Sequence, residues 1–153
     1  MEDCTIKLIK TSASFATNYW DRFVPYLESL VEQEEGRKPT IQHMNNILLG
    51  LNSGHLDLWI GVRFNEQERE MLGFLITSKY LGGPSGAGVL WISYLCGMAA
   101  LPEEAWAAGI EELKQWAALN NCTQLIATTR YAHVAKACMK TGAAQDMRLT
   151  WRV

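Results

Sequence analysis

Residues 58–76, LWIGVRFNEQEREMLGFLI, contain two β-rich runs on either side of a polar turn. The runs extend over residues 56–64 (LDLWIGVRF) and 71–80 (MLGFLITSKY), and NEQERE forms the segment between them. Two apolar and aromatic runs joined by a short polar segment are typical of a β-hairpin. We therefore expect a hairpin in the middle of the chain, with the other elements arranged on either side of it.

Before the hairpin, the pattern predicts one strand followed by helices. Residues 4–10 (CTIKLIK) alternate between apolar and polar side chains, which predicts a short strand. In residues 13–36 the apolar side chains recur every three or four positions, which predicts a helix. Pro25 lies inside that helical pattern, so either the helix kinks there or two shorter helices meet. Thr40 is suited to cap a further helix that stops at residues 52–54.

Beyond the hairpin, strand-like and helical patterns alternate to the end of the sequence, after a glycine-rich connector at 81–88 (LGGPSGAG). The whole series reads β-α-α-β-β-β-α-β-α-β, and no linker divides it. It therefore predicts an α/β (α+β) fold in a single domain over residues 1–153. The expected elements are a strand at 89–98, an amphipathic helix at 103–119, a strand at 123–129, a short helix at 131–140 that ends at Gly142, and a last strand at 144–153 (AQDMRLTWRV).

Composition excludes several classes of protein. The 14 basic residues are outnumbered by 16 acidic ones, so the net charge is −2, and proteins that bind nucleic acid usually carry a basic patch. No apolar run reaches the 18 residues of a membrane span, and no signal segment is present, so we expect a cytoplasmic protein. The four cysteines and three histidines are dispersed, which predicts reduced thiols and no metal site.

The order of elements, together with three local motifs, resembles the GNAT N-acetyltransferase superfamily. The motifs are Leu72-Gly73-Phe74 in the hairpin, NNCTQLIATTR at 120–130, and KACMKTGAAQDMRLTWRV at 136–153. The resemblance implies a mixed, mostly antiparallel central sheet with splayed fourth and fifth strands and with helices on both faces. It also implies transfer of an acetyl group from acetyl-CoA to an amine.

The same resemblance implies a donor site between the strands at 89–98 and 123–129. The pantetheine arm of acetyl-CoA would pair with the exposed edge of the first strand, at Leu95, Cys96, Gly97 and Met98. The pyrophosphate would lie at the start of the following helix, where the family pattern is Gln/Arg-x-x-Gly-x-Gly/Ala.

This chain departs from that pattern in the loop at 99–109 (AALPEEAWAAG). The two glycine positions fall near Glu104 and Trp106, and the position of the cation falls near Leu101. We therefore expect a degenerate pyrophosphate loop, with Trp106 as a contact residue. The same segment also makes a good helix start, because it has Pro102 in the first turn and acidic residues at the positive end of the helix dipole.

The resemblance further implies an acid that protonates the leaving thiolate and a base or water chain that deprotonates the amine. The strand at 89–98 has no carboxylate, and Tyr94 is among its polar candidates. The family's tyrosine position in the last helix holds Cys138, and Tyr131 and His133 lie in the first turn of that helix. These four residues are the candidate catalytic residues. Each also has a plain structural interpretation, as a core residue for Cys138 and as surface or capping residues for Tyr131 and His133.

Two functions follow as hypotheses. The first is a divergent acetyl-CoA-dependent N-acetyltransferase that acts on an unknown amine. The second is a GNAT-like protein without catalysis that serves as a structural or interaction protein. Small divergent proteins of this kind resemble gene products of tailed bacteriophages, some of which are packaged in virions. The apolar end segment MRLTWRV could pair with a partner's edge in a homo-oligomer or larger assembly.

Overall fold

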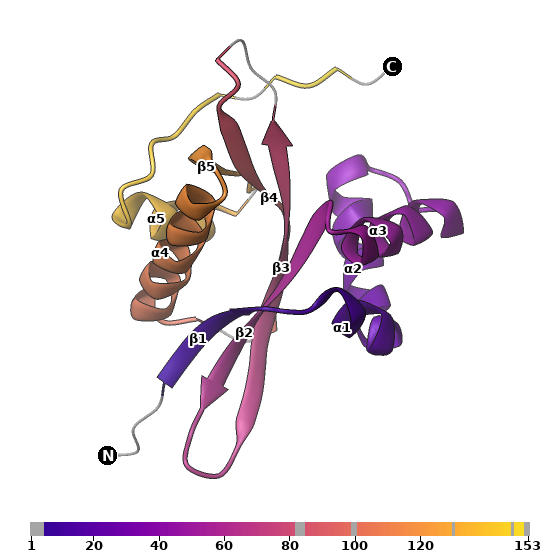
Figure 1. Ribbon diagram of the computed structural model, residues 1–153, viewed down its shortest axis with the longest axis horizontal. Coiled ribbons are helices and arrows are strands. Elements are labelled where there is room, and N and C mark those ends of the chain that lie inside the picture. Colours follow the sequence, from indigo (N-terminus) through magenta and orange to yellow (C-terminus); the bar gives the residue numbers. More distant parts are fainter. Residues whose placement is uncertain (1–4, 82–84, 99–100, 130, 148, 152–153) are drawn as a thin grey trace.

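The computed structural model describes residues 5–81, 85–98, 101–129, 131–147 and 149–151. Cys4, the middle of the glycine-rich connector and the first two residues of the 99–109 loop lie outside these ranges. The elements, shown in Figure 1, are β1 (Thr5–Lys10), α1 (Ala13–Asn18), α2 (Trp20–Glu35), α3 (Ile41–Ser53), β2 (Leu56–Phe64), β3 (Arg69–Leu81), β4 (Gly88–Gly97), α4 (Glu103–Leu119), β5 (Cys122–Ala127) and α5 (Ala132–Lys140).

The five strands form one sheet in the order β1-β2-β3-β4-β5. The first four strands are antiparallel to their neighbours, and β5 runs parallel to β4. β5 pairs with residues 88–92 of β4 and ends at Ala127, opposite Ile92, so residues 93–97 of β4 extend beyond the paired part. The mixed, mostly antiparallel sheet with splayed fourth and fifth strands is therefore confirmed.

Helices cover both faces of the sheet (Figure 1). Under α1–α3, Phe23 of α2 packs edge-on against Phe74 of β3, with ring centroids 5.1 Å apart. Under α4, Trp59 of β2 meets Trp116 at 90° and 5.6 Å. Burial of these aromatic and aliphatic side chains on two sides of one sheet is the main source of stability.

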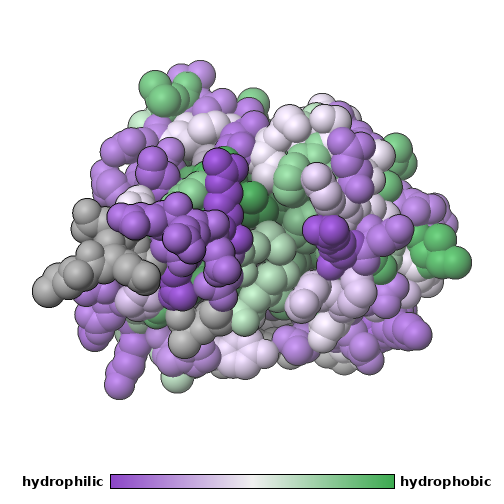
Figure 2. All heavy atoms as spheres, turned by 90° about the horizontal axis from the view of Figure 1, so that it is seen from below, coloured by the Kyte–Doolittle hydropathy of each residue, from purple (hydrophilic) through white to green (hydrophobic). Residues whose placement is uncertain are grey.

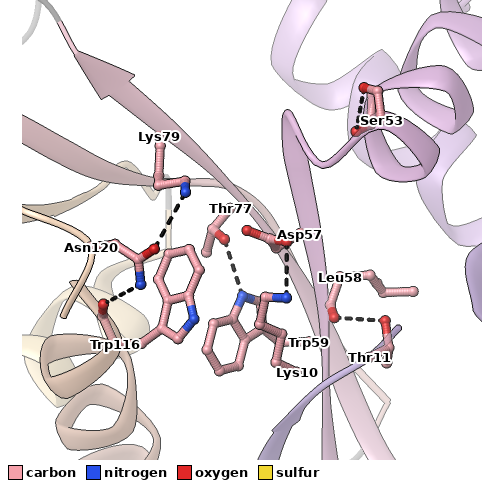
Figure 3. A network of polar contacts seen from close by, with 11 residues as sticks. Lys10, Thr11, Ser53, Asp57, Leu58, Trp59, Thr77, Lys79, Trp116 and Asn120 are labelled. Carbon is pink, nitrogen blue, oxygen red and sulfur yellow. Dashed lines mark hydrogen bonds and ion pairs between the residues drawn. The ribbon is translucent and has the colours of Figure 1, made fainter. Parts of the chain in front are cut away.

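Polar contacts join β2 to β3 and also join α4 to the sheet (Figure 3). The indole Nε1 of Trp59 donates to the Thr77 hydroxyl at 3.0 Å, and both side chains are buried. Lys79 Nζ at the end of β3 donates to Asn120 Oδ1 at 3.4 Å, and Asn120 Nδ2 donates to the carbonyl of Trp116 at 2.9 Å. The end of α4 is thereby held next to the end of β3.

A bulge in β4 decides which side chains face each helical layer. Ile76 pairs with Tyr94 and Thr77 pairs with Ile92, so Ser93 is an extra residue in β4. An extra residue shifts the alternation of side chains by one position. After the bulge, Leu95 packs on the α4 side, whereas Tyr94 packs against the core under α1–α3.

The first helical segment breaks at a different residue from the one expected. The boundary lies at Tyr19, whose φ of −118° and ψ of 18° are not helical, and Pro25 lies inside α2. With the break at Tyr19, α1 and α2 both direct apolar residues, Ala16 and Phe23, into the same core. The cap predicted at Thr40 is confirmed, because its hydroxyl accepts the His43 N–H at 3.2 Å.

The strand predicted at 144–153 is wrong for the residues that the structure describes. Residues 143–147 and 149–151 form no strand, and this C-terminal segment runs from α5 past the end of the sheet (Figure 1). Alternation favours an extended chain, but a strand also requires an edge to pair with. Within the described parts of the chain, no helix is both long and apolar enough to cross a bilayer.

Candidate functional site

The splay between β4 and β5 leaves one half of β4 without a strand on that side. Residues 93–97 have no partner in β5 among the described residues. Leu95, Cys96 and Gly97 lie on this segment, and Gly97 is exposed. Met98 follows it and donates its backbone N–H to the Leu72 carbonyl at 2.8 Å. Leu95, Cys96 and Gly97 therefore lie together on a segment whose outer edge has no strand beside it among the described residues, whereas the Met98 N–H is directed to β3 and Trp106 lies on α4.

The start of α4 and the end of α5 line an open pocket of about 250 Å³. Glu103 and Glu104 occupy the first turn of α4, which has Pro102 as its N-cap. The Nζ of Lys140, at the end of α5, forms an ion pair with Glu103 Oε1. The pocket is lined by Glu103, Glu104, Trp106, Ala107, Ala137, Lys140 and Thr141.

The charges around this pocket do not fit a diphosphate. Its lining carries two carboxylates and one ammonium group, and that ammonium group is already paired with Glu103. Two like charges about 4 Å apart repel by roughly 4 kcal/mol at an effective dielectric of 20, and less where water screens them. The helix start therefore keeps the positive end of its dipole but places its own carboxylates where an anion would bind.

The C-terminal end of α2 forms the other side of the site. Tyr131, the N-cap of α5, donates from its hydroxyl to Gln33 Oε1 at 3.1 Å. Burial, and then the charges of Glu35 and Glu34, raise the pKa of the Tyr94 phenol above its ordinary value. Both tyrosines therefore lie beside the last turn of α2, and the phenol of Tyr94 is neutral at physiological pH.

The other two candidate residues lie on α5. His133 is exposed and its ring lies 5.7 Å from that of Tyr131, so it is grouped with the α2 side. Cys138 is half-buried, and burial raises the pKa of its thiol, which keeps it protonated. Cys138 directly follows Ala137, which lines the pocket at the start of α4. α5 thus extends from Tyr131, beside the end of α2, to Lys140, beside the carboxylates at the start of α4.

Four residues of the site were not found by sequence reasoning: Gln33, Glu34 and Glu35 on α2, and Lys140 on α5. The only sequence signal of the three α2 residues is the acidic run at 32–35, which is also typical of a solvated helix end, and Lys140 has no such signal. Their importance comes from contacts with residues far away in the chain.

Among the described residues, the cysteines and the other metal-ligand types do not gather into a metal site. Cys96, Cys122 and Cys138 are free thiols. No group of three or more His, Cys, Asp or Glu residues that could hold a metal ion occurs within the described ranges.

Figure 2 shows the face of the molecule that is seen from below in the view of Figure 1. Apolar residues lie in the middle of this face, and hydrophilic residues lie on both sides of them.

In sequence, the chain matches no family model and no curated protein. In three dimensions it is similar to several acetyltransferases over nearly its full length. A probable acetyltransferase superposes with a TM-score of 0.70 at 12% identity, covering 96% of this chain and 97% of that one. An aminoglycoside acetyltransferase, meta-AAC0020 from an uncultured soil metagenomic sample, in complex with sisomicin, gives 0.69 at 11% identity, covering 97% and 95%.

A third similar structure is the aminoglycoside N-acetyltransferase AAC(6')-Iy in complex with CoA. It gives a TM-score of 0.59 at 14% identity and covers 100% of this chain and 95% of its own. At identities this low, the likeness concerns the fold alone, and the fold is GNAT-like.

Proposed function

We propose that this protein is an N-acyltransferase that transfers an acyl group from a thioester to an amine. The observation that carries the proposal is the segment of β4 at residues 93–97, which pairs with β3 but has no β5 partner among the described residues. Tyr94 lies on this segment, and both Tyr94 and Tyr131 lie beside the last turn of α2. Such a transfer forms the amide C–N bond, breaks the thioester C–S bond and releases a thiol and a proton. The acetyltransferase-like fold supports the same reaction class.

The end of α2 supports an amine as the acceptor. Glu34 and Glu35 lie in the last turn, which has no basic residue, and the C-terminal end of a helix carries a partial negative charge. Their charges act on Tyr94, so they also lie close enough to act on a ligand beside it. A protonated amine is the ligand that such a potential attracts.

The phenols of Tyr94 and Tyr131 are the groups we assign to proton donation. The Tyr94 phenol carries its proton at neutral pH, so it can hydrogen-bond to a thiolate leaving group and protonate it, and its raised pKa makes it a weaker acid than an exposed tyrosine. β4 carries no carboxylate that could act as a base. We therefore assign deprotonation of the amine to water at the exposed side of the site.

Acetyl-CoA fits this site only in part. The free backbone edge of β4 suits the amide-bearing pantetheine arm, whereas the carboxylates at the start of α4 do not suit the diphosphate. We therefore propose that donor affinity comes from the thioester and its arm, with no net contribution from the diphosphate.

The test is calorimetric titration of the full chain with acetyl-CoA and, separately, with S-acetylpantetheine, which lacks the diphosphate. We expect both to bind with affinities within a few-fold of each other. If acetyl-CoA bound tenfold more tightly than S-acetylpantetheine, or tighter still, the diphosphate would contribute to donor affinity, which would contradict the proposal. No binding of either compound at millimolar concentration would overturn the acyltransferase proposal.

A second candidate function is a non-catalytic interaction or structural protein, such as a component of a virion. The ion pair between Glu103 and Lys140 favours it, because this pair occupies the helix start with groups of the chain itself. Incubation with acetyl donors and a panel of polyamines, followed by mass spectrometry, separates the two functions. An acetylated amine supports the enzyme, and its absence with every donor supports the interaction protein.

A further inference from the structure

Helix α2 lies beside the part of β4 that has no β5 partner among the described residues. The ring of Tyr26, in the first half of α2, is T-shaped to the ring of Phe74, with the centroids 6.3 Å apart. Phe74 pairs with Cys96 of β4. At the other end of α2, Glu35 lies close enough to Tyr94 for its charge to act on the phenol. α2 therefore follows β4 from Cys96 to Tyr94.

The surface between these two elements is mostly apolar. Four partly buried side chains pack on the core that contains Phe74: Leu30, Tyr94, Cys96 and Met98. Tyr26 also contacts Phe74 but is itself 45% exposed, so part of its ring is open to a ligand. Aromatic rings, a thioether, a thiol and a leucine side chain offer contact area but few strong hydrogen bonds.

The other hydroxyl groups around Tyr94 are engaged within the chain. Ser78 and Ser93 bond to each other at 3.1 Å, and the Tyr131 hydroxyl donates to a side chain of α2. The Tyr94 hydroxyl has no hydrogen-bond partner among the described residues, and no buried side-chain oxygen of these residues lacks one, so this hydroxyl reaches solvent. The polar groups left for a ligand therefore lie at the two ends of the surface, with Tyr94 and the carboxylates of α2 at one end and the Tyr26 hydroxyl at the other.

We propose that the acceptor is a primary amine on an apolar body, an inference that rests on the acyl transfer proposed above. The ammonium group lies between Tyr94 and the last turn of α2, and the hydrocarbon body lies along α2, over Cys96 and against the ring of Tyr26. Tyr26 and Glu35 are nine positions apart, about 13 Å along the helix, so a body of several carbons fits between them. The ammonium ion and the thioester give the amide, the thiol and one proton, which passes to water.

Desolvation sets the selectivity of such a site. An apolar body releases water from the ring of Tyr26 and from the side chain of Cys96, which favours binding. A hydroxylated body of the same length gives up its own hydrogen bonds to water, and the surface between Tyr26 and Tyr94 returns few of them. The site should therefore prefer the hydrocarbon amine.

The test compares two amines with the same unbranched carbon skeleton. Hexylamine carries no other polar group, whereas glucamine carries a hydroxyl group on each remaining carbon. Acetylation of each amine by the full chain, with S-acetylpantetheine and separately with acetyl-CoA as donor, is followed by mass spectrometry. We expect kcat/KM for hexylamine to exceed that for glucamine by roughly tenfold or more.

The outcomes separate the nature of the acceptor from the reaction itself. Equal values, or a preference for glucamine, would overturn the apolar-body proposal and leave the acyltransferase proposal in place, because an amine would still be acetylated. The same holds if polyamines are acetylated and hexylamine is not. If no amine is acetylated with either donor, the proposed function fails, and the apolar-body proposal fails with it.

Variants of Tyr26 locate the body of the acceptor. Tyr26→Ala should lower kcat/KM for hexylamine several-fold, through KM, and leave kcat/KM for glucamine nearly unchanged. Tyr26→Leu should keep the preference, because leucine retains an apolar contact. The matched control is Tyr80→Ala, which removes an exposed tyrosine (67%) opposite Val89, in the part of β4 that pairs with β5, and should change neither value. Circular dichroism checks that all three variants are folded. An equal loss for both amines in Tyr26→Ala, or a lost preference in Tyr26→Leu, would overturn the placement of the body on this surface.

Discussion

Glu103 and Glu104 place two carboxylates in the first turn of α4, where the helix dipole stabilises them and where a diphosphate would be repelled. Replacing both with glutamine leaves the turn intact and removes the repulsion. Interactions between exposed charges are worth about 0.2–1 kcal/mol each, so we expect acetyl-CoA affinity to rise roughly 2–30-fold for the pair. Calorimetric titration measures the change in acetyl-CoA affinity.

Glu112→Gln is the control for this change, because Glu112 is exposed on the same helix but lies more than two turns further along. It should leave acetyl-CoA affinity unchanged. S-acetylpantetheine affinity should also stay the same in the double variant. An equal rise for both donors would show that the carboxylates act on something other than the diphosphate.

Ionisation of Tyr94 makes the free energy of unfolding depend on pH, and the surroundings of Tyr94 determine the direction of this dependence. Burial, then Glu35 and Glu34, raise its pKa, so its neutral form is favoured in the folded state. Its contribution to stability is complete below the ordinary tyrosine pKa and is lost as pH rises through the folded value. We therefore expect the free energy of unfolding to fall more steeply above about pH 10 in the native protein than in Tyr94→Phe, measured by urea denaturation.

The cause of the shift can be tested by ultraviolet titration of the phenols. The difference between the native protein and Tyr94→Phe isolates Tyr94, and its midpoint should fall in Glu35→Gln. Glu66→Gln, in the turn between β2 and β3, should leave the midpoint unchanged. A midpoint that does not change in Glu35→Gln would mean that α2 does not lie beside Tyr94. The support for an amine as the acceptor would then be lost.

At the scale of elements, the pairing of β3 with β4 depends on Gly73. A Cβ at this position would overlap the carbonyl oxygen of Cys96 and lie 3.3 Å from the Cα of Gly97, which pair with β3 but have no partner in β5. Gly73→Ala should therefore destabilise the protein by about 1–3 kcal/mol, the usual cost of overpacking, and should weaken donor binding. Urea denaturation and calorimetry measure the two effects.

Gly61 is the matched control, because it lies directly opposite Gly73 on β2. A Cβ there would meet nothing closer than 3.8 Å. Gly61→Ala should be neutral or slightly stabilising, since alanine loses less backbone entropy than glycine in a strand. If the two variants were equally destabilised, close approach of β4 would not be the reason that glycine occupies position 73.

At the scale of the whole molecule, α5 is held at its two ends by contacts to different layers. Tyr131 bonds to Gln33 of α2 and Lys140 pairs with Glu103 of α4, and both contacts are exposed. Val134 is the buried residue of α5. Exposed pairs contribute about 1 kcal/mol or less, so α5 should open locally more often than the sheet.

Hydrogen exchange followed by mass spectrometry tests whether α5 opens locally. In Tyr131→Phe/Lys140→Met, amides of α5 should exchange several-fold faster, while the free energy of global unfolding changes by no more than about 2 kcal/mol. Amides of β3, whose residues 72–77 are buried, serve as the internal reference and should keep their rates. Protection of α5 equal to that of β3 in the native protein would contradict local opening.

Much of the fold could be predicted because its signals are local. The helix at 103–119 and the strand at 56–64 have the predicted bounds, and the Thr40 cap has the predicted role. Periodicity and capping depend on residues within a few positions of each other. Where a signal depended on a partner, prediction failed: the last segment alternates like a strand, but a strand exists only with an edge beside it.

The sequence by itself determined the order and type of nearly all elements, and it also determined the carboxylates at the start of α4. Only the tertiary structure decided that Tyr131 meets Gln33, 98 positions away, and that Lys140 meets Glu103, 37 positions away. It also decided, through the bulge at Ser93, that Tyr94 faces α2. Such contacts join side chains that are distant in the chain, so they leave no period in the sequence and arise only when both helical layers pack on one sheet.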